Sequence, residues 1–357
     1  MGSIITGTGS YIPEEIQSNT IFLQNEFYDA GHHPLEEKNE LIIEKFKNIT
    51  GIEERRYLSS DLNNSDIATI AGQRAIKHAG IDPESIDQII VAHNFGNLVG
   101  DSKQSDMLPS IASKVKHLLG IANPNCVAYD IIFGCPGWIQ GMIQADQFIQ
   151  TGMAKRCLVI GSETLSRIID PHDRDSMIYA DGAGACILEK GSNPEKGIMS
   201  YASQTFTFEE SNYIFFGESN NTETAENTYY LKMQGRKIYE FALNNVPSAM
   251  KLALEKSGIP IDKVKKILIH QANEKMDEAI IKRFYRLFKK GIPKDIMPMS
   301  INKLGNSSVA TVPTLLDLIL SGNLDQHHID EGDAIILASV GACLLYTSDA
   351  ADDVSTV

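Results

Sequence analysis

A single cysteine, Cys135, lies where a strand-like run of residues meets the predicted start of a helix. The preceding segment, 125–133, is apolar and β-prone with one interrupting Asp, and Pro136 suits a first helical position. A sulfur atom at such a junction faces unpaired backbone N–H groups and the positive end of the helix dipole. Both favour the thiolate, which is the nucleophilic form of cysteine. Cys135 is therefore a candidate nucleophile, and a buried, inert thiol is the alternative interpretation.

Two further polar residues, His270 and Asn306, are candidates for the same site. His270 directly follows the apolar run 267–269, and ligands of open α/β sheets gather beyond the carboxyl ends of strands. Asn306 lies in a polar, glycine-containing loop that runs into a predicted helix, where its amide N–H₂ group can turn toward a ligand. Taken singly, Asn306 also suits a helix cap or a turn, and His270 suits a structural role. The combination with Cys135 is what points to catalysis.

The chain contains an internal repeat that predicts its architecture. Each copy has a helix-like stretch, a turn that begins Gly-Ile and a buried-type strand, and the copies align without a gap over 80–91 and 258–269. A second pair of similar strand-like segments is 156–162 and 333–339. Continuous Val, Ile and Leu strands between helices indicate sheets that are covered on both faces. We therefore predict two related α/β halves in a layered α-β-α-β-α body, divided in the turn-rich stretch near 190–200.

Composition and charge narrow the class of protein. The chain has 357 residues, of which 43% are hydrophobic, enough for one large domain or two similar ones. The formal net charge of −14 argues against nucleic acid or an anionic membrane as the main partner. We interpret the basic segment 282–290 as a solvated helix face, with contact to an acidic carrier protein or a phosphate as the alternative.

The cysteines and the hydropathy pattern indicate a protein of the cytoplasm. There are five cysteines, an odd number, and no CxxC pair, which favours a reducing compartment over a disulfide framework or a zinc site. No apolar stretch is long enough to cross a membrane, and the N-terminus lacks the pattern of a signal peptide. We therefore expect no bound metal, no membrane partner and a cytoplasmic location.

A series of motifs resembles the β-ketoacyl-acyl carrier protein synthase III family, which has the thiolase-like fold. The motifs occur in the family's order between about residue 2 and residue 342, at 128–130, 134–137, 158–163, 170–174, 181–185, 270–273 and 305–308. The resemblance implies Cys135 as the acyl-accepting nucleophile, with His270 and Asn306 as the pair that serves decarboxylation. It also implies an oxyanion hole formed by the N–H groups of Cys135 and Gly341. On this basis residues 1–192 form the half that carries the nucleophile, and 193–343 the half that carries His and Asn.

The resemblance also implies the reaction and its partners. The expected activity is an acyltransferase reaction, the decarboxylating Claisen condensation of an acyl thioester primer with malonyl-acyl carrier protein. It proceeds through an acyl-cysteine intermediate, in fatty acid or polyketide-type biosynthesis. The expected partners are acyl carrier protein and an acyl-CoA or acyl-carrier-protein primer, and the expected assembly is a homodimer built around the central sheet of the first half. No metal or redox cofactor is required.

The residues that contact substrate in this family are only partly retained. Arg174 matches the arginine that clamps the adenine of coenzyme A, but the partner tryptophan position falls on about Lys45. Two further family arginines fall on Ile49 and Lys275, and Leu108 stands where many members have a Phe before Pro-Ser. We therefore take Arg174, Lys275 and Leu108 as candidate substrate contacts. The pattern leaves open whether coenzyme A or a carrier protein delivers the primer, and Leu108 is compatible with a primer other than acetyl.

The C-terminal residues depart most from the family pattern. The family completes a core strand after Gly341, whereas residues 343–353 of this chain become polar and acidic within a few positions. This segment resembles translated adapter sequence more than a natural strand. We therefore predict that 344–357 is a non-native or frayed tail, unpaired beyond about residue 346.

Three other functions compete with the condensing enzyme. A thiolase or hydroxymethylglutaryl-CoA synthase relative would use a second, late cysteine such as Cys343, but His270 and Asn306 fit the decarboxylating branch better. A cysteine hydrolase also uses Cys, His and Asn side chains, but the internal repeat gives it no support. A non-catalytic partner subunit usually lacks the nucleophile, and Cys135 is present.

Overall fold

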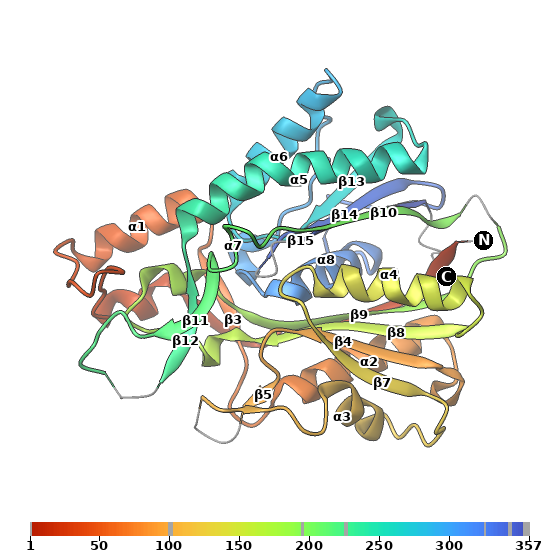
Figure 1. Ribbon diagram of the computed structural model, residues 1–357, viewed down its shortest axis with the longest axis horizontal. Helices are drawn as coiled ribbons and strands as arrows, with labels where there is room; N and C mark the ends of the chain where they lie inside the picture. Colours follow the sequence, from red (N-terminus) through yellow and green to blue (C-terminus); the bar gives the residue numbers. More distant parts are fainter. Residues whose placement is uncertain are drawn as a thin grey trace.

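Two β-sheets form the centre of the protein (Figure 1). The computed structural model describes residues 2–98, 103–193, 196–224, 228–324, 326–341 and 345–352. The first sheet has the spatial order β1 (Ser3–Tyr11), β9 (Asp181–Lys190), β8 (Arg156–Thr164), β4 (Gln88–His93) and β7 (Val127–Ile132). The second sheet has the order β10 (Gly197–Thr205), β15 (Leu345–Asp352), β14 (Ala334–Ser339) and β13 (Val264–Ile269).

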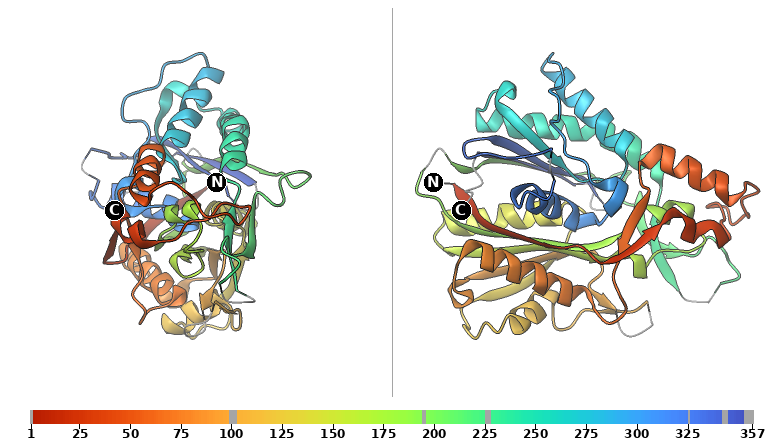
Figure 2. Two further views of the ribbon diagram at one scale, coloured as in Figure 1. Left: turned by 90° about the vertical axis from the view of Figure 1, so that its left-hand side faces the viewer. Right: turned by 180° about the vertical axis from the view of Figure 1, so that it is seen from behind.

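Helices form three layers around these sheets. Helices α4 (Gly137–Gln150) and α8 (Thr311–Leu320) lie between the sheets, and each packs against strands of both. The outer face of the first sheet is covered by α2 (Asn64–Ala79) and α3 (Ile111–Leu118), and that of the second by α5 (Gly235–Ser257) and α6 (Glu274–Leu287) (Figures 1 and 2). The predicted α-β-α-β-α order is confirmed. Within the described residues, no helix has both the length and the apolar character that crossing a bilayer requires.

The internal repeat corresponds to equivalent elements in the two halves. In the first half β4 pairs in parallel with β8, and in the second half β13 pairs in parallel with β14. The helices before β4 and β13, α2 and α5, both end at a glycine in the left-handed region, Gly80 with φ 64° and Gly258 with φ 74°. A Cβ is disfavoured there, which explains the glycine that opens both copies of the repeat. The two halves share one apolar core around α4 and α8.

The described tail does not fray as predicted. Residues 345–352 form β15, which pairs in antiparallel fashion with both β10 and β14. A strand in this position satisfies the backbone N–H and C=O groups of two neighbours, and backbone pairing does not require apolar side chains. The prediction of an unpaired segment beyond about residue 346 is therefore wrong for 345–352. Cys343 and residues 353–357 lie outside the described part of the chain.

Elements outside the repeat gather at one end of the molecule (Figures 1 and 2). This end carries helix α1 and the pairs β2–β3 and β11–β12. Their bounds are α1 (Asn39–Thr50), β2 (Glu15–Ser18), β3 (Glu54–Tyr57), β11 (Ile214–Glu218) and β12 (Tyr229–Met233). The remaining short elements are β5 (Asn97–Leu98), β6 (Ser105–Asp106) and α7 (Ile301–Leu304). Helix α1 matters for function because it forms one wall of the pocket described below.

Candidate active site

Cys135 occupies the junction that the sequence predicts. Strand β7 ends at Ile132, helix α4 begins at Gly137, and the side chain of Cys135 between them is partly exposed. Gly134 has φ 71°, and its carbonyl accepts a hydrogen bond from the Gly137 N–H at 2.9 Å, which closes a tight turn around the cysteine. Pro136 is the N-cap of α4 and not its first helical residue, a difference of one position. The sulfur therefore lies beside the start of a buried helix.

His270 follows the last residue of β13 and is buried. Its backbone N–H donates to the Ala338 carbonyl at 2.8 Å, which ties the residue to the end of β14. Burial lowers the pKa of His270 to about 4, although a hydrogen bond to the Ser308 backbone favours the charged form. Within the described residues the ring Nδ1 has no hydrogen-bond partner. At neutral pH this imidazole is therefore uncharged, so one ring nitrogen carries an N–H and can donate it.

Asn306 is held by backbone hydrogen bonds on both sides. Its N–H donates to the Ile178 carbonyl and its carbonyl accepts from the Ala180 N–H, each at 2.9 Å. The side-chain Oδ1 accepts from the Ser308 N–H at 2.8 Å, so the Nδ2 end of the amide faces away from that contact. Gly305 precedes it with φ 68°, and a Cβ there would lie 2.7 Å from Cβ of Arg55. The loop therefore requires glycine, and it presents the Asn306 amide as a donor.

Ser308 links the three predicted residues, although it was not itself predicted as a site residue. Its hydroxyl donates to Cys135 Sγ at 3.2 Å, its N–H donates to Asn306 Oδ1, and its backbone is hydrogen-bonded to His270. Ser308 has φ 54°, a left-handed conformation that side-chain-bearing residues rarely adopt. Cys135, His270 and Asn306 therefore converge on one residue. Its sequence signal was its place in the motif 305–308, two residues after Asn306.

Gly341 lies directly against the nucleophile. A Cβ on Gly341 would be 2.7 Å from the backbone nitrogen of Cys135 and 2.8 Å from its Cβ. Only glycine allows this approach, because real Cβ atoms do not come so close to backbone atoms. The structure thus brings together the two residues predicted to form the oxyanion hole.

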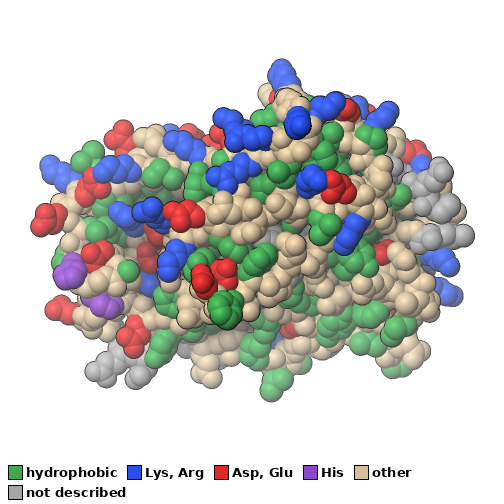
Figure 3. All heavy atoms as spheres, turned by 45° about the horizontal axis from the view of Figure 1, so that its top comes forward, with side chains coloured by type: hydrophobic (Ala, Val, Ile, Leu, Met, Phe, Trp, Pro, Cys, Tyr) green, Lys and Arg blue, Asp and Glu red, His purple; other side chains and the backbone are tan. Residues whose placement is uncertain are grey.

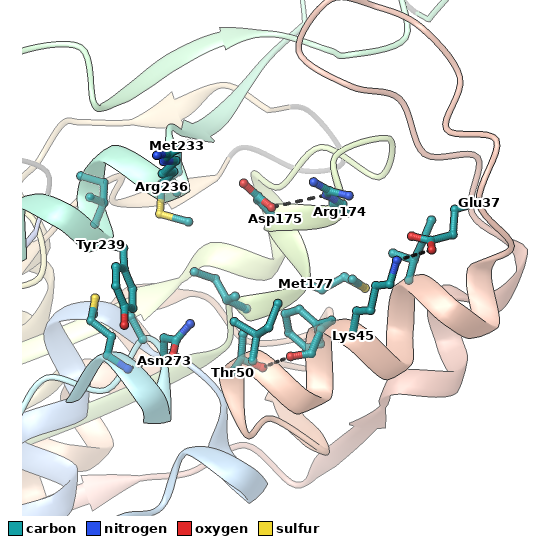
Figure 4. A pocket seen from close by; sticks show the side chains of 18 residues that line it. Glu37, Lys45, Thr50, Arg174, Asp175, Met177, Met233, Arg236, Tyr239 and Asn273 are labelled. Carbon is teal, nitrogen blue, oxygen red and sulfur yellow. Dashed lines mark hydrogen bonds and ion pairs between the residues drawn. The ribbon is translucent and has the colours of Figure 1, made fainter. Parts of the chain in front are cut away.

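A pocket of about 530 Å³ is connected to this site through Ile178, which lines the pocket and whose carbonyl accepts from the Asn306 N–H (Figure 4). Cys135, His270 and Asn306 themselves are not among its lining residues. It is lined by α1, by the turn at 174–178, by the start of α5 and by Asn273, three residues after His270. Arg174 and Lys45 are on its wall, each with an acidic neighbour: Arg174 Nε lies 3.9 Å from Asp175 Oδ1, and Lys45 pairs with Glu37. Burial raises the pKa of Asp175 to about 6, and the nearby Asp173 adds to the rise.

Two predicted substrate contacts do not line this pocket. Lys275 is exposed on the outward side of α6, while its neighbour Met276 turns inward and lines the wall. Leu108 lies on the loop before α3 with 84% of its surface exposed. Helix periodicity explains the first case, because residues that are adjacent on a helix face different directions. Arg174 alone of the three proposed contacts reaches the pocket.

No metal centre is apparent in the described ranges, where no three His, Cys, Asp or Glu side chains are grouped to hold an ion. The four cysteines described, at positions 126, 135, 157 and 186, are thiols that form no disulfide. The site as described therefore consists of a thiol, an imidazole, an amide, a hydroxyl and backbone N–H groups. This set suits acyl transfer with stabilisation of an oxyanion.

Comparison with known proteins points to one family for both halves. The family model of 3-oxoacyl-[acyl-carrier-protein (ACP)] synthase III matches residues 129–206, and the model of its C-terminal part matches 254–351. The chain is 34% identical over 350 residues to the β-ketoacyl-[acyl-carrier-protein] synthase III of Caldanaerobacter subterraneus subsp. tengcongensis, with 96% of each protein covered.

Solved structures agree with this assignment. The 3-oxoacyl-[acyl-carrier-protein] synthase III from Aquifex aeolicus VF5 superposes with a TM-score of 0.80 at 27% identity, over 99% of this chain and 100% of that one. The priming β-ketosynthase of the R1128 polyketide pathway also superposes with a TM-score of 0.80, at 25% identity. That superposition covers 98% of this chain and 96% of the other. The fold is therefore thiolase-like. Full-length similarity at 34% identity, together with the Cys135, His270 and Asn306 geometry, shows that the chain belongs to the β-ketoacyl-[acyl-carrier-protein] synthase III family.

Proposed function

We propose that the protein catalyses the decarboxylating condensation of an acyl thioester primer with malonyl-acyl carrier protein. The observation that carries the proposal is the convergence of Cys135, His270 and Asn306 on Ser308 in a chain of this family. The reaction divides into two steps, acylation of the cysteine and condensation. Both use only protein groups and the two thioesters.

In the first step Cys135 accepts the acyl group. Its sulfur attacks the carbonyl carbon of the primer thioester, and the negative charge on the carbonyl oxygen is stabilised by the N–H groups of Cys135 and Gly341. The bond from the acyl carbon to the donor sulfur then breaks. The donor leaves as a thiolate and takes up the proton that the Cys135 thiol has lost. One thioester replaces another, so the acyl group stays activated.

In the second step the malonyl thioester loses CO₂ and becomes a nucleophile. The electron pair of the broken carbon–carbon bond moves into an enolate, whose oxygen accepts hydrogen bonds from His270 and the Asn306 amide. Each such donor contributes roughly 3 to 4 kcal/mol in a site that excludes water. The enolate carbon attacks the acyl-Cys135 carbonyl, the carbon–sulfur bond breaks, and the sulfur leaves as a thiolate. Burial keeps His270 neutral, so no proton has to be lost from a cation first.

The pocket is proposed as the channel for the thioester arm. Its wall is largely apolar, with Ile42, Phe46 and Ile238 among its residues, and it carries cationic groups at Lys45, Arg174 and Arg236. Such a lining suits a long flexible arm that ends in a phosphate. Basic side chains also gather over α6 and the residues after it (Figure 3), where Lys282, Arg283, Arg286, Lys289 and Lys290 are exposed. This surface supports docking of an acidic acyl carrier protein.

Strand β7 supports a homodimer. It is an edge strand of the first sheet, and its apolar residues Val127 and Ile132 are 51% and 56% exposed. An exposed apolar edge strand is a template for pairing with another chain, and a second copy can pair by two-fold symmetry. Sedimentation of the purified protein tests this assembly. The absence of a disulfide among the four described cysteines supports a cytoplasmic location.

The experiment that tests the function is intact-protein mass spectrometry. The protein is incubated with a panel of acyl-CoA and acyl-carrier-protein donors, beside Cys135→Ala. We expect a mass gain of one acyl group in the native protein and none in the variant, and the best donor identifies the primer and its carrier. A folded protein that takes up no acyl group from any donor would contradict the proposal.

A further inference from the structure

A buried chain of hydrogen bonds joins Glu163 to the nucleophile. Glu163 lies near the end of β8 and is 1% exposed. Its Oε1 accepts from the backbone N–H of Asn94 and from Asn94 Nδ2, the latter at 2.7 Å. Asn94 Nδ2 also donates to Ser308 Oγ at 2.9 Å, and Ser308 Oγ donates to Cys135 Sγ at 3.2 Å. The chain thus runs from β8, past the end of β4, to the loop before α8.

The order of donors in this chain directs the Ser308 hydroxyl. The Asn94 N–H₂ group has two hydrogens, one for Glu163 and one for Ser308. Because Ser308 Oγ accepts from Asn94, its own single hydrogen is available for the Cys135 sulfur. Without the Glu163 acceptor, the amide could turn and present Oδ1 to Ser308, and the hydroxyl would then donate to Asn94.

The backbone conformation of Ser308 and the packing of Val309 also position the Ser308 hydroxyl beside the Cys135 sulfur. Ser308 has φ 54°, in a region that disfavours a residue with a Cβ. The next residue, Val309, packs so closely on β8 that a Cβ on Gly161 would lie 2.4 Å from its carbonyl oxygen. Unfavourable backbone conformations that are held in place by close packing occur at functional sites. Here the conformation places the hydroxyl on the sulfur.

Three titratable groups of this region are His270, Tyr179 and Glu163, and each is buried. Burial lowers the pKa of His270 to about 4 and raises that of Tyr179 well above its usual value. Burial also raises the pKa of Glu163 to about 8, and a protonated carboxyl still accepts through its carbonyl oxygen. None of these three groups supplies a positive charge to the sulfur, whereas the Ser308 hydroxyl and the start of α4 both favour a negative sulfur.

We propose that Ser308 is a catalytic residue that donates a hydrogen bond to the Cys135 sulfur, and that Asn94 and Glu163 are positioning residues that hold it as a donor. The inference rests on the proposed function and adds to it. The hydrogen bond stabilises the thiolate before it attacks the primer, and again when it leaves the product. Decarboxylation, which uses His270 and the Asn306 amide, does not require it.

The test measures the alkylation of Cys135 by iodoacetamide across pH, read at Cys135 by peptide mass. Two variants remove the hydroxyl with opposite effects on the backbone. Ser308→Ala keeps a Cβ at the unfavourable φ of 54°, whereas Ser308→Gly removes the Cβ and makes this φ favourable. Ser307→Ala is the matched control, because the Ser307 hydroxyl is 3.3 Å from Thr311 Oγ1 and belongs to the same loop. Asn94→Asp replaces the donor amide by an acceptor of the same shape, and Glu163→Gln retains an acceptor oxygen.

The expected result is a shift shared by both Ser308 variants. We expect their alkylation profiles to move about one pH unit to the alkaline side, with acylation by the primer about tenfold slower. Asn94→Asp should show the same alkaline shift of its alkylation profile. The profile of Ser307→Ala should be that of the native protein. The alkylation rate of Glu163→Gln at pH 7 should lie within about twofold of the native rate. Decarboxylation of malonyl-acyl carrier protein should fall less than acylation in both Ser308 variants, because the Ser308 backbone that holds Asn306 is retained.

Two results would overturn the inference. One is a native alkylation profile in both Ser308→Ala and Ser308→Gly. The other is an equal loss of acylation and decarboxylation in these variants, which would indicate a structural role only. Iodoacetamide is not an acyl donor, so the alkylation result does not depend on the condensing activity. A shifted profile in a protein that forms no acyl-enzyme would retain the inference and contradict the proposed function.

Discussion

The two halves of the repeat place different chemistry at equivalent positions. Both central helices, α4 and α8, begin near the site, and each is preceded by a loop that carries functional residues. The loop before α4 carries Cys135, which is partly exposed, whereas the second half supplies His270 and Asn306, each 2% exposed. An attacking atom must meet an incoming thioester, but hydrogen-bond donors gain strength from exclusion of water. Under the proposed function, the first half holds the nucleophile and the second half holds the groups that stabilise the enolate.

The largest expected effect follows from removing the nucleophile of the first half. Cys135→Ala should abolish acylation and lower condensation by at least about a thousandfold, because no covalent intermediate can form. Product formation from primer and malonyl-acyl carrier protein measures the change. An unchanged thermal unfolding midpoint is the control. Condensation near the native rate in this variant would mean that the acyl group is carried elsewhere.

Removing a hydrogen-bond donor of the second half should slow condensation but leave acylation of Cys135 nearly unchanged. His270→Ala or Asn306→Ala should lower condensation about a hundredfold or more, the usual cost of losing one preorganised donor. Acyl-enzyme formation should stay within about threefold of the native rate, because the acylation step relies on backbone N–H groups. Quenched time courses of acyl-enzyme mass separate the two steps. An equal loss of rate in acyl-enzyme formation and in condensation would show that the two halves do not act separately.

Gly341 tests the contact between the halves. Gly341→Ala would place a Cβ 2.7 Å from the Cys135 nitrogen, so one of the two backbones must shift. Displacement of a reacting group by about 1 Å costs up to about a hundredfold, so we expect acylation to slow by roughly tenfold to a hundredfold. Gly291→Ala is the matched control, since a Cβ there has no neighbour within 4 Å and needs no unusual φ. Native acylation in Gly341→Ala would argue against the oxyanion hole.

The smallest expected effect is a pH dependence of stability that belongs to His270. Because its pKa is about 4 when folded and about 6.5 when unfolded, the unfolded chain binds the proton more readily between these values. Stability is therefore lost as the pH falls through this window, by about 2 kcal/mol between pH 7 and pH 5. Urea unfolding of the native protein and of His270→Ala at both pH values measures it. The same pH dependence in both proteins would contradict a neutral, buried His270.

The residues with a local signature were predictable from the sequence. Cys135 stands at a strand-to-helix junction and His270 at the end of a repeated strand, and both positions are visible in the order of residues. The two sheets and the central helices likewise follow from the repeat and from continuous apolar strands.

Features that depend on long-range contacts were not predictable in the same way. Asn94 reaches Glu163 and Ser308 across 69 and 214 positions of the chain, and no local pattern records that contact. Ser308 has a left-handed φ of 54° although it is not a glycine, so no local residue type signals this conformation. Strand β15 was mispredicted because the interpretation weighed side-chain polarity, whereas its position is determined by two backbone neighbours. The C-terminal family match also extends through residue 351, which includes most of this strand.

The division of chemistry between the halves is tested most directly by CO₂ release from malonyl-acyl carrier protein without primer. The native protein, Cys135→Ala and His270→Ala are compared at one substrate concentration. We predict that Cys135→Ala releases CO₂ within about threefold of the native rate, while His270→Ala is slower by about a hundredfold or more. Loss of CO₂ release in Cys135→Ala to the same extent as in His270→Ala would contradict it.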